Sequence, residues 1–261
     1  MRGRVYRGAV ALSLAASVAA LTFVLAEQAG GQRALAALAQ LLPEWARLAA
    51  SAIGGYLLGS IPFGFIFVGM LRERDITTEG SGRIGGTNAM RAGGMGAGAL
   101  TVAGDVCKGF AAVVLARTLL PGSPWAEVLA GWGAVLGHNA SIYVGFRGGA
   151  GSGPNMGVAG AFWPPSLIVT LACLPFSLLV IGYASVGSML IAAVIIVIFA
   201  LRAALGHGPV EYIWYGIGAA ALVVYALRPN IERLVKGEER RLGLPARLSR
   251  AKQSKTAGSG Q

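Results

Sequence analysis

Charged residues are scarce in this chain. They make up 13% of its 261 residues, whereas an average soluble domain carries about 25%. So few charges cannot solvate the surface of a folded domain of this length, and this excludes an ordinary soluble protein. Cysteine is also rare, with only Cys107 and Cys173. Both lie in apolar segments, so we interpret them as small buried hydrophobic residues without a disulfide, redox or metal role.

Acidic residues are half as numerous as basic residues, with 11 against 22, and the net charge is +11. A basic protein of this kind suits either nucleic acid or anionic lipids and substrates. The basic residues lie mostly at the ends of apolar segments and in the C-terminal tail. We therefore expect membrane lipids and anionic substrates as partners, and no nucleic acid.

Apolar runs and glycine are abundant. Residues 9–26, 181–201 and 212–227 are almost entirely apolar, and about 20 such residues cross a hydrocarbon core about 30 Å thick. The 40 glycines suit membrane helices, whose backbones approach each other closely where side chains are small. The sequence therefore predicts an all-α polytopic membrane protein.

Eight spans are predicted, the first of them at the N-terminus. The other seven lie at residues 48–71, 100–120, 125–146, 156–169, 171–186, 187–205 and 210–227. Pro164 and Pro165 mark a break between two short spans, and an alternative topology treats 156–186 as one broken helix, which leaves six core spans.

The chain divides into three parts. Residues 1–47 are expected to form an extra N-terminal transmembrane helix and, at 30–42, an interfacial linker. A cleaved signal peptide is the alternative for the first of these. Residues 48–242 form the membrane core, and 243–261 form a basic, disordered tail.

The positive-inside rule gives the orientation of the spans. One side of the predicted topology holds Arg2, Arg4, Arg7, Arg72, Arg74, Arg83, Arg91, Arg147 and the nine basic residues from Arg228 to Lys255. The other side holds Arg33, Arg47, Arg117 and Arg202. We therefore expect the N-terminus, the loops on the first side and the tail to face the cytoplasm.

The loop at residues 75–91 is rich in glycine and in polar side chains. Gly80 and Gly82 permit positive φ, so successive backbone N–H groups can turn toward one anion. Side-chain donors in this loop are Ser81, Thr87, Asn88 and Arg91. The planar guanidinium of Arg91 suits phosphate, and a helix that begins just after the loop would add its dipole. A flexible connector is the alternative.

Asp105 and Lys108 lie three residues apart in an apolar span, so they share a helix face and can pair. Charges at membrane depth are costly and are usually paired or functional. Two interpretations stay open. Either Lys108 reaches the cytoplasmic interface with Asp105 as its partner, or Asp105 orients Arg91 or another basic group in a site.

A second glycine-rich loop, at residues 145–155, predicts another anion-binding cradle with Arg147 at its edge. Its glycines include Gly148, Gly149 and Gly151. His138 lies about two helical turns earlier inside a predicted span. It either forms a hydrogen bond between helices or takes part in catalysis.

The last polar segment begins at Arg228, where the final span is expected to end. Pro229 suits the first turn of a new helix. Asn230 and Glu239 then belong to a short amphipathic stretch at the membrane interface. The alternative is the positively charged end that most final membrane helices have.

Taken together, these segments resemble the bacterial acyl-phosphate:glycerol-3-phosphate acyltransferase family between about Gly54 and Glu239. The matching residues, in the family's order, are Gly59-Ser-Ile-Pro-Phe-Gly64, Gly80-Ser-Gly-x-Ile-Gly-x-Thr-Asn88 with Arg91, Asp105-x-x-Lys-Gly109, Gly137-His138, Phe146-Arg-Gly-Gly-x-Gly151, and Asn230-Ile-x-Arg-Leu-x-x-Gly237 with Glu239.

The resemblance implies a seven-helix fold in the bacterial inner membrane, with an active site at the cytoplasmic face. It implies transfer of a fatty acyl group from acyl phosphate to glycerol 3-phosphate, giving lysophosphatidic acid and phosphate without a metal or other cofactor. Acyl phosphate is already activated, so the protein mainly has to orient a hydroxyl against a carbonyl and stabilise an oxyanion. The oligomeric state stays open.

Site residues carry over position by position. The resemblance implies catalytic roles for Ser81, Asn88, Arg91, Asn230 and Glu239. It implies substrate and phosphate binding by Gly80, Gly82, Arg83, Thr87, Arg147, Gly148, Gly149, Gly151 and Arg228. Supporting roles fall to Asp105, Lys108 and His138.

Four positions depart from the family pattern. Arg83 replaces an asparagine, Gly86 an alanine, Ala150 a lysine and Leu227 a histidine. The family's lysine and histidine are expected to contact phosphate or assist transfer, and Arg83 is hypothesised to supply the missing charge. Their loss leaves open a relative that binds or transports a phosphorylated or lipid ligand, or that acylates another phosphorylated acceptor.

Overall fold

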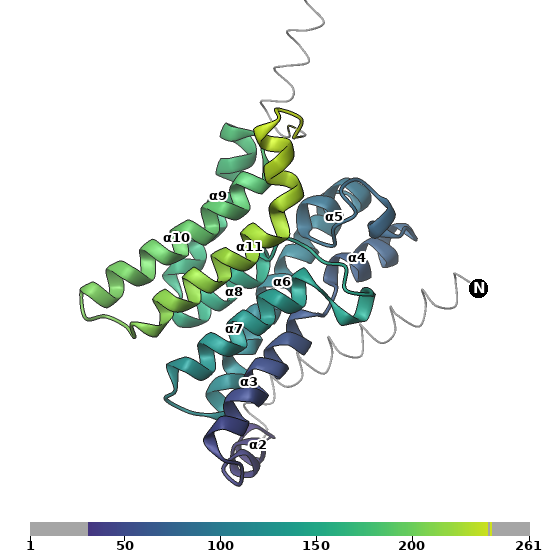
Figure 1. The fold of residues 1–261 in the computed structure, drawn as a ribbon. Coiled ribbons are helices and arrows are strands. Elements are labelled where there is room, and N and C mark those ends of the chain that lie inside the picture. Colours follow the sequence, from purple (N-terminus) through teal and green to yellow (C-terminus); the bar gives the residue numbers. More distant parts are fainter. Residues whose placement is uncertain (1–30, 240, 242–261) are drawn as a thin grey trace, which may run out of the picture.

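The computed structural model describes residues 31–239 and 241, and the regular elements in these residues are helices (Figure 1). The all-α prediction is therefore confirmed for this part of the chain. The predicted N-terminal span at 9–26 and the tail at 243–261 lie outside the described residues.

Ten α-helices are described. They are α2 Gly31–Ala39, α3 Glu44–Gly59, α4 Phe63–Arg72, α5 Gly86–Gly93, α6 Met95–Leu119, α7 Pro124–Asn139, α8 Ser152–Phe162, α9 Pro165–Phe176, α10 Ala184–Ala204 and α11 Glu211–Val235. Short 3-10 turns lie at Ile76–Thr78 and Ile142–Val144, and a π-helical turn, Ser177–Ile181, continues α9. Within the described residues, three segments are long and apolar enough to cross a membrane: Glu44–Arg72, Met95–Leu119 and Ala184–Ala204.

The first core span, predicted at 48–71, is interrupted in its middle. α3 ends at Gly59 and α4 begins at Phe63, with Pro62 between them. Proline has no N–H and prevents a continuous helical hydrogen-bond ladder. The carbonyl oxygens near the break are used by side chains instead: Lys108 Nζ donates to the Ile61 oxygen at 2.8 Å.

Helices α8 and α9 form a hairpin, so the alternative of one broken helix over 156–186 is wrong. The chain reverses at Trp163 and Pro164, between Phe162 and Pro165. Leu174, near the end of α9, and Ser152, at the start of α8, line one cavity, which is described in the next section. The predicted break at Pro164–Pro165 is confirmed. α8 has 11 residues, so it is about 16 Å long and covers only half of a hydrocarbon core.

Two predicted boundaries are wrong at the C-terminal ends of helices. α7 ends at Asn139 rather than at 146, and the chain then turns so that Ser141 pairs with Arg147. α11 continues through Pro229 to Val235, so Pro229 does not begin a new helix. Pro229 has no N–H to donate to the Tyr225 oxygen four residues earlier, and the guanidinium of Arg83 donates to the neighbouring Ala226 oxygen at 2.6 Å.

Glycine allows the closest helix contacts, as predicted from composition. A Cβ atom added to Gly55 of α3 would lie 2.2 Å from the Ala130 oxygen of α7. On α8, a Cβ at Gly157 would lie 2.0 Å from the Val106 oxygen of α6. The backbones of α3 and α7, and those of α6 and α8, therefore touch directly, which is how membrane helices associate through small residues.

The two cysteines differ. Cys173 is buried, but Cys107 is exposed on α6, and both thiols are free. The prediction that Cys107 is buried is therefore wrong, because its position turns away from the helix face that carries the buried Asp105 and Lys108.

Basic residues separate between the two ends of the bundle. Arg117 pairs with Glu127 at 2.9 Å and donates to the Ala161 oxygen near the α8–α9 turn. Arg202 stacks on Trp163 at the same turn, 4.4 Å from the ring centre. These two arginines were predicted to lie on the side with few positive charges, and they lie away from the cavity described next.

Candidate active site

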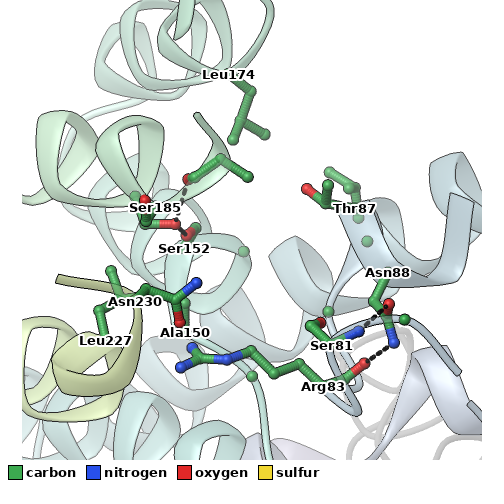
Figure 2. A pocket seen from close by; sticks show the side chains of 18 of the residues that line it. Ser81, Arg83, Thr87, Asn88, Ala150, Ser152, Leu174, Ser185, Leu227 and Asn230 are labelled. Carbon is green, nitrogen blue, oxygen red and sulfur yellow. Dashed lines mark hydrogen bonds between the residues drawn. The ribbon is translucent and has the colours of Figure 1, made fainter. Parts of the chain in front are cut away.

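A cavity of about 430 Å³ lies between α5, α6, α8, α10 and α11 (Figure 2). Predicted site residues that line it are Gly80, Ser81, Arg83, Thr87, Asn88, Arg91, Asp105, His138, Gly149, Asn230 and Glu239. The segments predicted to bind anions thus meet in one place, although they are far apart in the sequence.

The loop before α5 is held in shape by Asn88. Its Oδ1 accepts from the Ser81 N–H at 3.1 Å. Its Nδ2 donates to the carbonyl oxygens of Ile76, Glu79 and Arg83 at 3.2, 2.9 and 2.8 Å. Gly80 has φ of +57°, and a Cβ there would lie 2.3 Å from Asn88 Oδ1. Both polar atoms of the Asn88 side chain thus hold the loop in shape.

Helix α5 begins inside this loop, at Gly86, and not after it as expected. The first N–H groups of a helix have no partner within the helix and carry the positive end of its dipole. Gly86 and Thr87 line the cavity, so this helix end is directed at it. Gly86 packs closely on α6, because a Cβ there would lie 2.4 Å from Val102 Cγ2.

Arg83 crosses the cavity from this loop to α11 (Figure 2). Its Nη2 holds the Ala226 oxygen, whereas its Nη1 is buried and has no hydrogen-bond partner among the described residues. Burial and the neighbouring Arg233 lower the pKa of Arg83, while Glu239 opposes that shift. The guanidinium remains a cation at any physiological pH, with one unsatisfied N–H arm beside the cavity.

On α11 and just beyond it, polar residues form a connected group. Asn230 Nδ2 donates to Glu239 Oε1 at 2.7 Å, and Arg233 pairs with Glu239 Oε2 at 3.3 Å. Asn230 Oδ1 is buried without a partner in the described part of the chain. Glu239 therefore orients Asn230 and Arg233 at the cavity wall.

At the floor of the cavity, three buried polar side chains form a cluster. Lys108 Nζ lies 2.8 Å from Asp105 Oδ1 and 3.0 Å from His138 Nδ1. Lys108 is 2% exposed, so the prediction that it reaches the membrane interface is wrong, whereas the predicted pairing with Asp105 is confirmed. Asp105 orients Lys108 rather than Arg91. His138 forms the hydrogen bond between helices that was one of its two interpretations.

Several predicted residues lie outside the cavity lining. They are Gly82, Lys108, Arg147, Gly148, Gly151 and Arg228. Arg147 is exposed and donates to Thr77 Oγ1 at 3.2 Å, and Arg228 stacks on Tyr225 at 4.6 Å from the ring centre. Gly148 and Gly151 shape the second loop instead: Cβ atoms there would lie 2.1 Å from the Asn139 oxygen and 2.9 Å from Asn139 Oδ1.

Other lining residues escaped the sequence analysis. Ser152 begins α8 and donates to Ser188 of α10 at 2.7 Å. Ser185, one residue into α10, has a buried hydroxyl without a partner in the described residues. Thus the N-termini of α8 and α10 also reach the cavity. In the sequence, Ser152 and Ser185 each precede an apolar run, and this pattern could have indicated that both lie at a helix N-terminus facing a polar site. Val102, Met156, Leu174 and Ala184 add an apolar side.

Comparison with protein families matches residues 49–237 to the family described as glycerol-3-phosphate acyltransferase. The chain belongs to this family. The glycerol-3-phosphate acyltransferase of Shouchella clausii (strain KSM-K16) is 38% identical over 198 residues, which are 75% of this chain and 96% of that protein. The one from Synechococcus sp. (strain JA-3-3Ab) is 40% identical over 205 residues, 77% of this chain and 97% of that protein.

Solved structures agree with this assignment. The crystal structure of PlsY (YgiH), described as an integral membrane glycerol 3-phosphate acyltransferase in its glycerol 3-phosphate form, aligns with a TM-score of 0.65. It is 31% identical and covers 77% of this chain and 98% of its own. The lysophosphatidic acid form aligns with a TM-score of 0.64. The resemblance drawn from the motifs is confirmed, and the chain is a multi-pass membrane protein of the glycerol-3-phosphate acyltransferase family.

Within this acyltransferase fold, two of the unusual residues lie in one apolar cluster. Leu227 is 2% exposed and is clustered with Val223 and Ala192, and Ala150 packs against this cluster. Ala150 and Leu227 thus belong to one apolar wall on the side of the cavity that Arg83 reaches.

Proposed function

We propose that this protein transfers a fatty acyl group from acyl phosphate to a hydroxyl of glycerol 3-phosphate. The observation that carries the proposal is the composition of the cavity. Arg83, Arg91 and Arg233 line it together with the N-terminus of α5, and an apolar side faces them. Two phosphorylated substrates, one with a fatty chain, need both features. The names of the relatives, glycerol-3-phosphate acyltransferase, support glycerol 3-phosphate as the acceptor of the acyl group.

The reaction needs no covalent intermediate with the protein. The acceptor hydroxyl oxygen bonds to the carbonyl carbon of acyl phosphate, and the carbonyl electrons move onto oxygen. When they return, the bond from that carbon to the phosphate oxygen breaks. The hydroxyl proton leaves with the inorganic phosphate, so atoms and charge balance. The protein contributes by orienting the two substrates and by stabilising the oxyanion.

Proposed roles follow from the contacts. Ser81, Arg83, Arg91 and Thr87 supply donors to the phosphate groups, because they line the cavity near the start of α5. Asn88 and Glu239 are positioning residues, since their polar atoms hold other residues of the site. Arg83 takes over the positive charge that Ala150 and Leu227 no longer provide.

The site is proposed to face the cytoplasm of a bacterial inner membrane. Support comes from the positive-inside rule, because the arginines of the cavity and its loops lie at one end of the bundle. Arg117 and Arg202 lie at the other end, by the α8–α9 turn.

A second function remains a candidate because of the apolar wall around Ala150 and Leu227. In that case the protein binds a phosphorylated or lipid ligand without transferring an acyl group to glycerol 3-phosphate, or it acylates another phosphorylated acceptor.

One assay separates these functions. Purified protein is incubated with acyl phosphate, and phosphate release is followed with and without glycerol 3-phosphate, with Arg91→Ala as the control. Acceptor-dependent release and formation of lysophosphatidic acid are expected. Release no faster than that of the Arg91→Ala control contradicts the acyltransferase.

A further inference from the structure

The buried cluster of Asp105, Lys108 and His138 includes a histidine as well as a charge pair, and its contacts bear on the protonation of that histidine. A lysine ammonium has three N–H groups and no lone pair. Lys108 Nζ forms hydrogen bonds with the Ile61 oxygen at 2.8 Å and with His138 Nδ1 at 3.0 Å, and an ion pair with Asp105 Oδ1 at 2.8 Å. The buried ammonium is therefore held by two hydrogen bonds and one contact with an opposite charge.

This arrangement determines where the proton of His138 lies. Two groups compete for its Nδ1: Lys108 Nζ at 3.0 Å and Asp105 Oδ1 at 3.4 Å. The closer one, paired with the Asp105 carboxylate, is an ammonium that has no lone pair, so in this hydrogen bond Nδ1 is the acceptor. A neutral imidazole carries its single proton on the other nitrogen. His138 is therefore neutral, with the proton on Nε2.

The Nε2 atom of His138 is directed at the cavity wall formed by Gly149. A Cβ atom on Gly149 would lie 2.1 Å from Nε2, and the Gly149 N–H donates to the His138 carbonyl oxygen at 2.9 Å. Both residues line the cavity. Any side chain at position 149 would collide with or cover Nε2, so only glycine leaves this nitrogen uncovered beside the cavity.

We propose that His138 is a catalytic residue whose neutral Nε2–H donates a hydrogen bond to the carbonyl oxygen of the acyl donor. That oxygen gains negative charge when the acceptor hydroxyl adds to the carbonyl carbon and loses it when phosphate leaves, and the histidine proton is not transferred. Lys108 is a positioning residue that fixes the tautomer. The proposal rests on the proposed acyl transfer, and preorganised donors of this kind are effective because they need no reorientation during the reaction.

The tautomer can be measured without activity. The chain has two histidines, His138 and His207, so ¹⁵N-histidine-labelled full-length protein in detergent gives two imidazole signals, and His207→Gln assigns them. The expected spectrum shows a protonated Nε2 and an unprotonated Nδ1 for His138. In Lys108→Met the Asp105 carboxylate becomes the nearest partner of Nδ1, and the proton is expected to move there. A protonated Nδ1 in the wild type, or no change in Lys108→Met, overturns the role of Lys108.

Kinetics test the catalytic role. His138→Ala is expected to lower kcat at least about 100-fold, the loss typical of removing one oxyanion donor, with KM changed less than about threefold. His138→Gln, whose amide N–H reaches a similar place, is expected to recover part of kcat. Gly149→Ala, which covers Nε2 but keeps the histidine, is expected to lower kcat as well. Each variant is compared with wild type for its melting temperature, so that loss of fold is not mistaken for loss of catalysis.

The outcomes separate the two proposals. If the wild type catalyses acceptor-dependent transfer and folded His138→Ala and His138→Gln keep kcat within about threefold of it, the role of His138 is overturned and the acyltransferase stands. If His138→Ala does not fold, His138→Gln and Gly149→Ala decide: normal kcat in both overturns the proposal. If the wild type itself shows no transfer, the acyltransferase and the catalytic role of His138 both fail, and the tautomer measurement still decides the role of Lys108.

Discussion

Replacing Arg83 with alanine tests whether this arginine compensates for the family's missing lysine and histidine. Arg83 holds the Ala226 oxygen with Nη2 and has an unsatisfied Nη1 beside the cavity. A charge-assisted hydrogen bond to phosphate contributes about 1.5–3 kcal/mol. At about 1.4 kcal/mol per factor of ten, Arg83→Ala should lower kcat/KM about 10- to 150-fold.

The matched control is Arg147→Ala. Arg147 was also expected to bind phosphate, but it is exposed and contacts Thr77 outside the cavity. Its removal should leave kcat/KM within about twofold, since exposed polar contacts contribute little. Both variants are assayed by release of phosphate from acyl phosphate at several concentrations of glycerol 3-phosphate. An active wild type in which Arg83→Ala and Arg147→Ala behave alike would refute the compensation.

A rescue experiment sharpens the same test. The triple variant Arg83→Asn, Ala150→Lys, Leu227→His restores three of the four residues that the family resemblance implies and leaves Gly86 unchanged. Leu227→His alone places an imidazole in an apolar cluster close to Arg83, so it should lower both activity and melting temperature. The triple variant should regain activity that the single variant loses, because the positions are coupled. Additive effects of the three changes on kcat/KM would argue against coupling.

Three further predictions concern stability and the organisation of the site. Asp105→Leu should destabilise the protein by about 3–5 kcal/mol, because it leaves a buried ammonium unpaired, and adding Lys108→Met should recover most of the loss in a detergent unfolding assay. Gly55→Ala should lower the melting temperature, since its Cβ meets a backbone carbonyl of α7 at 2.2 Å, whereas Gly96→Ala, with no atom within 4 Å, should not. Glu239→Gln should lower kcat/KM about tenfold by weakening its two hydrogen-bonded partners, and an unchanged value would remove its positioning role.

Membrane class and the place of the first glycine-rich loop in a site follow from local sequence. The composition of residues Gly80 to Arg91 predicts an anion site, and the loop lines the cavity. The break at Pro164–Pro165 is equally local, because proline ends helices by its own geometry. These features need no knowledge of the remaining chain.

What escaped prediction depends on tertiary contacts. Pro229 was expected to begin a helix, but α11 passes through it, and the nearby Ala226 oxygen accepts from Arg83, which lies 143 residues before Ala226 in the sequence. Arg147 has the right type and neighbours for a phosphate ligand, yet its loop turns it toward Thr77. Ser185 joins the cavity because α10 begins there. Local patterns do not determine such contacts, since each depends on how two distant segments pack.

The interruption at Pro62 has a counterpart in ion transporters. In those proteins, carbonyl oxygens of an unwound membrane helix coordinate a dissolved cation near the middle of the bilayer. Here the carbonyl of Ile61 at the break coordinates the ammonium of Lys108, a cation that is covalently attached to the chain. Because this cation is a side chain of the protein, it cannot exchange with ions in the solution. Its occupancy of the site therefore does not depend on which salts the solution contains.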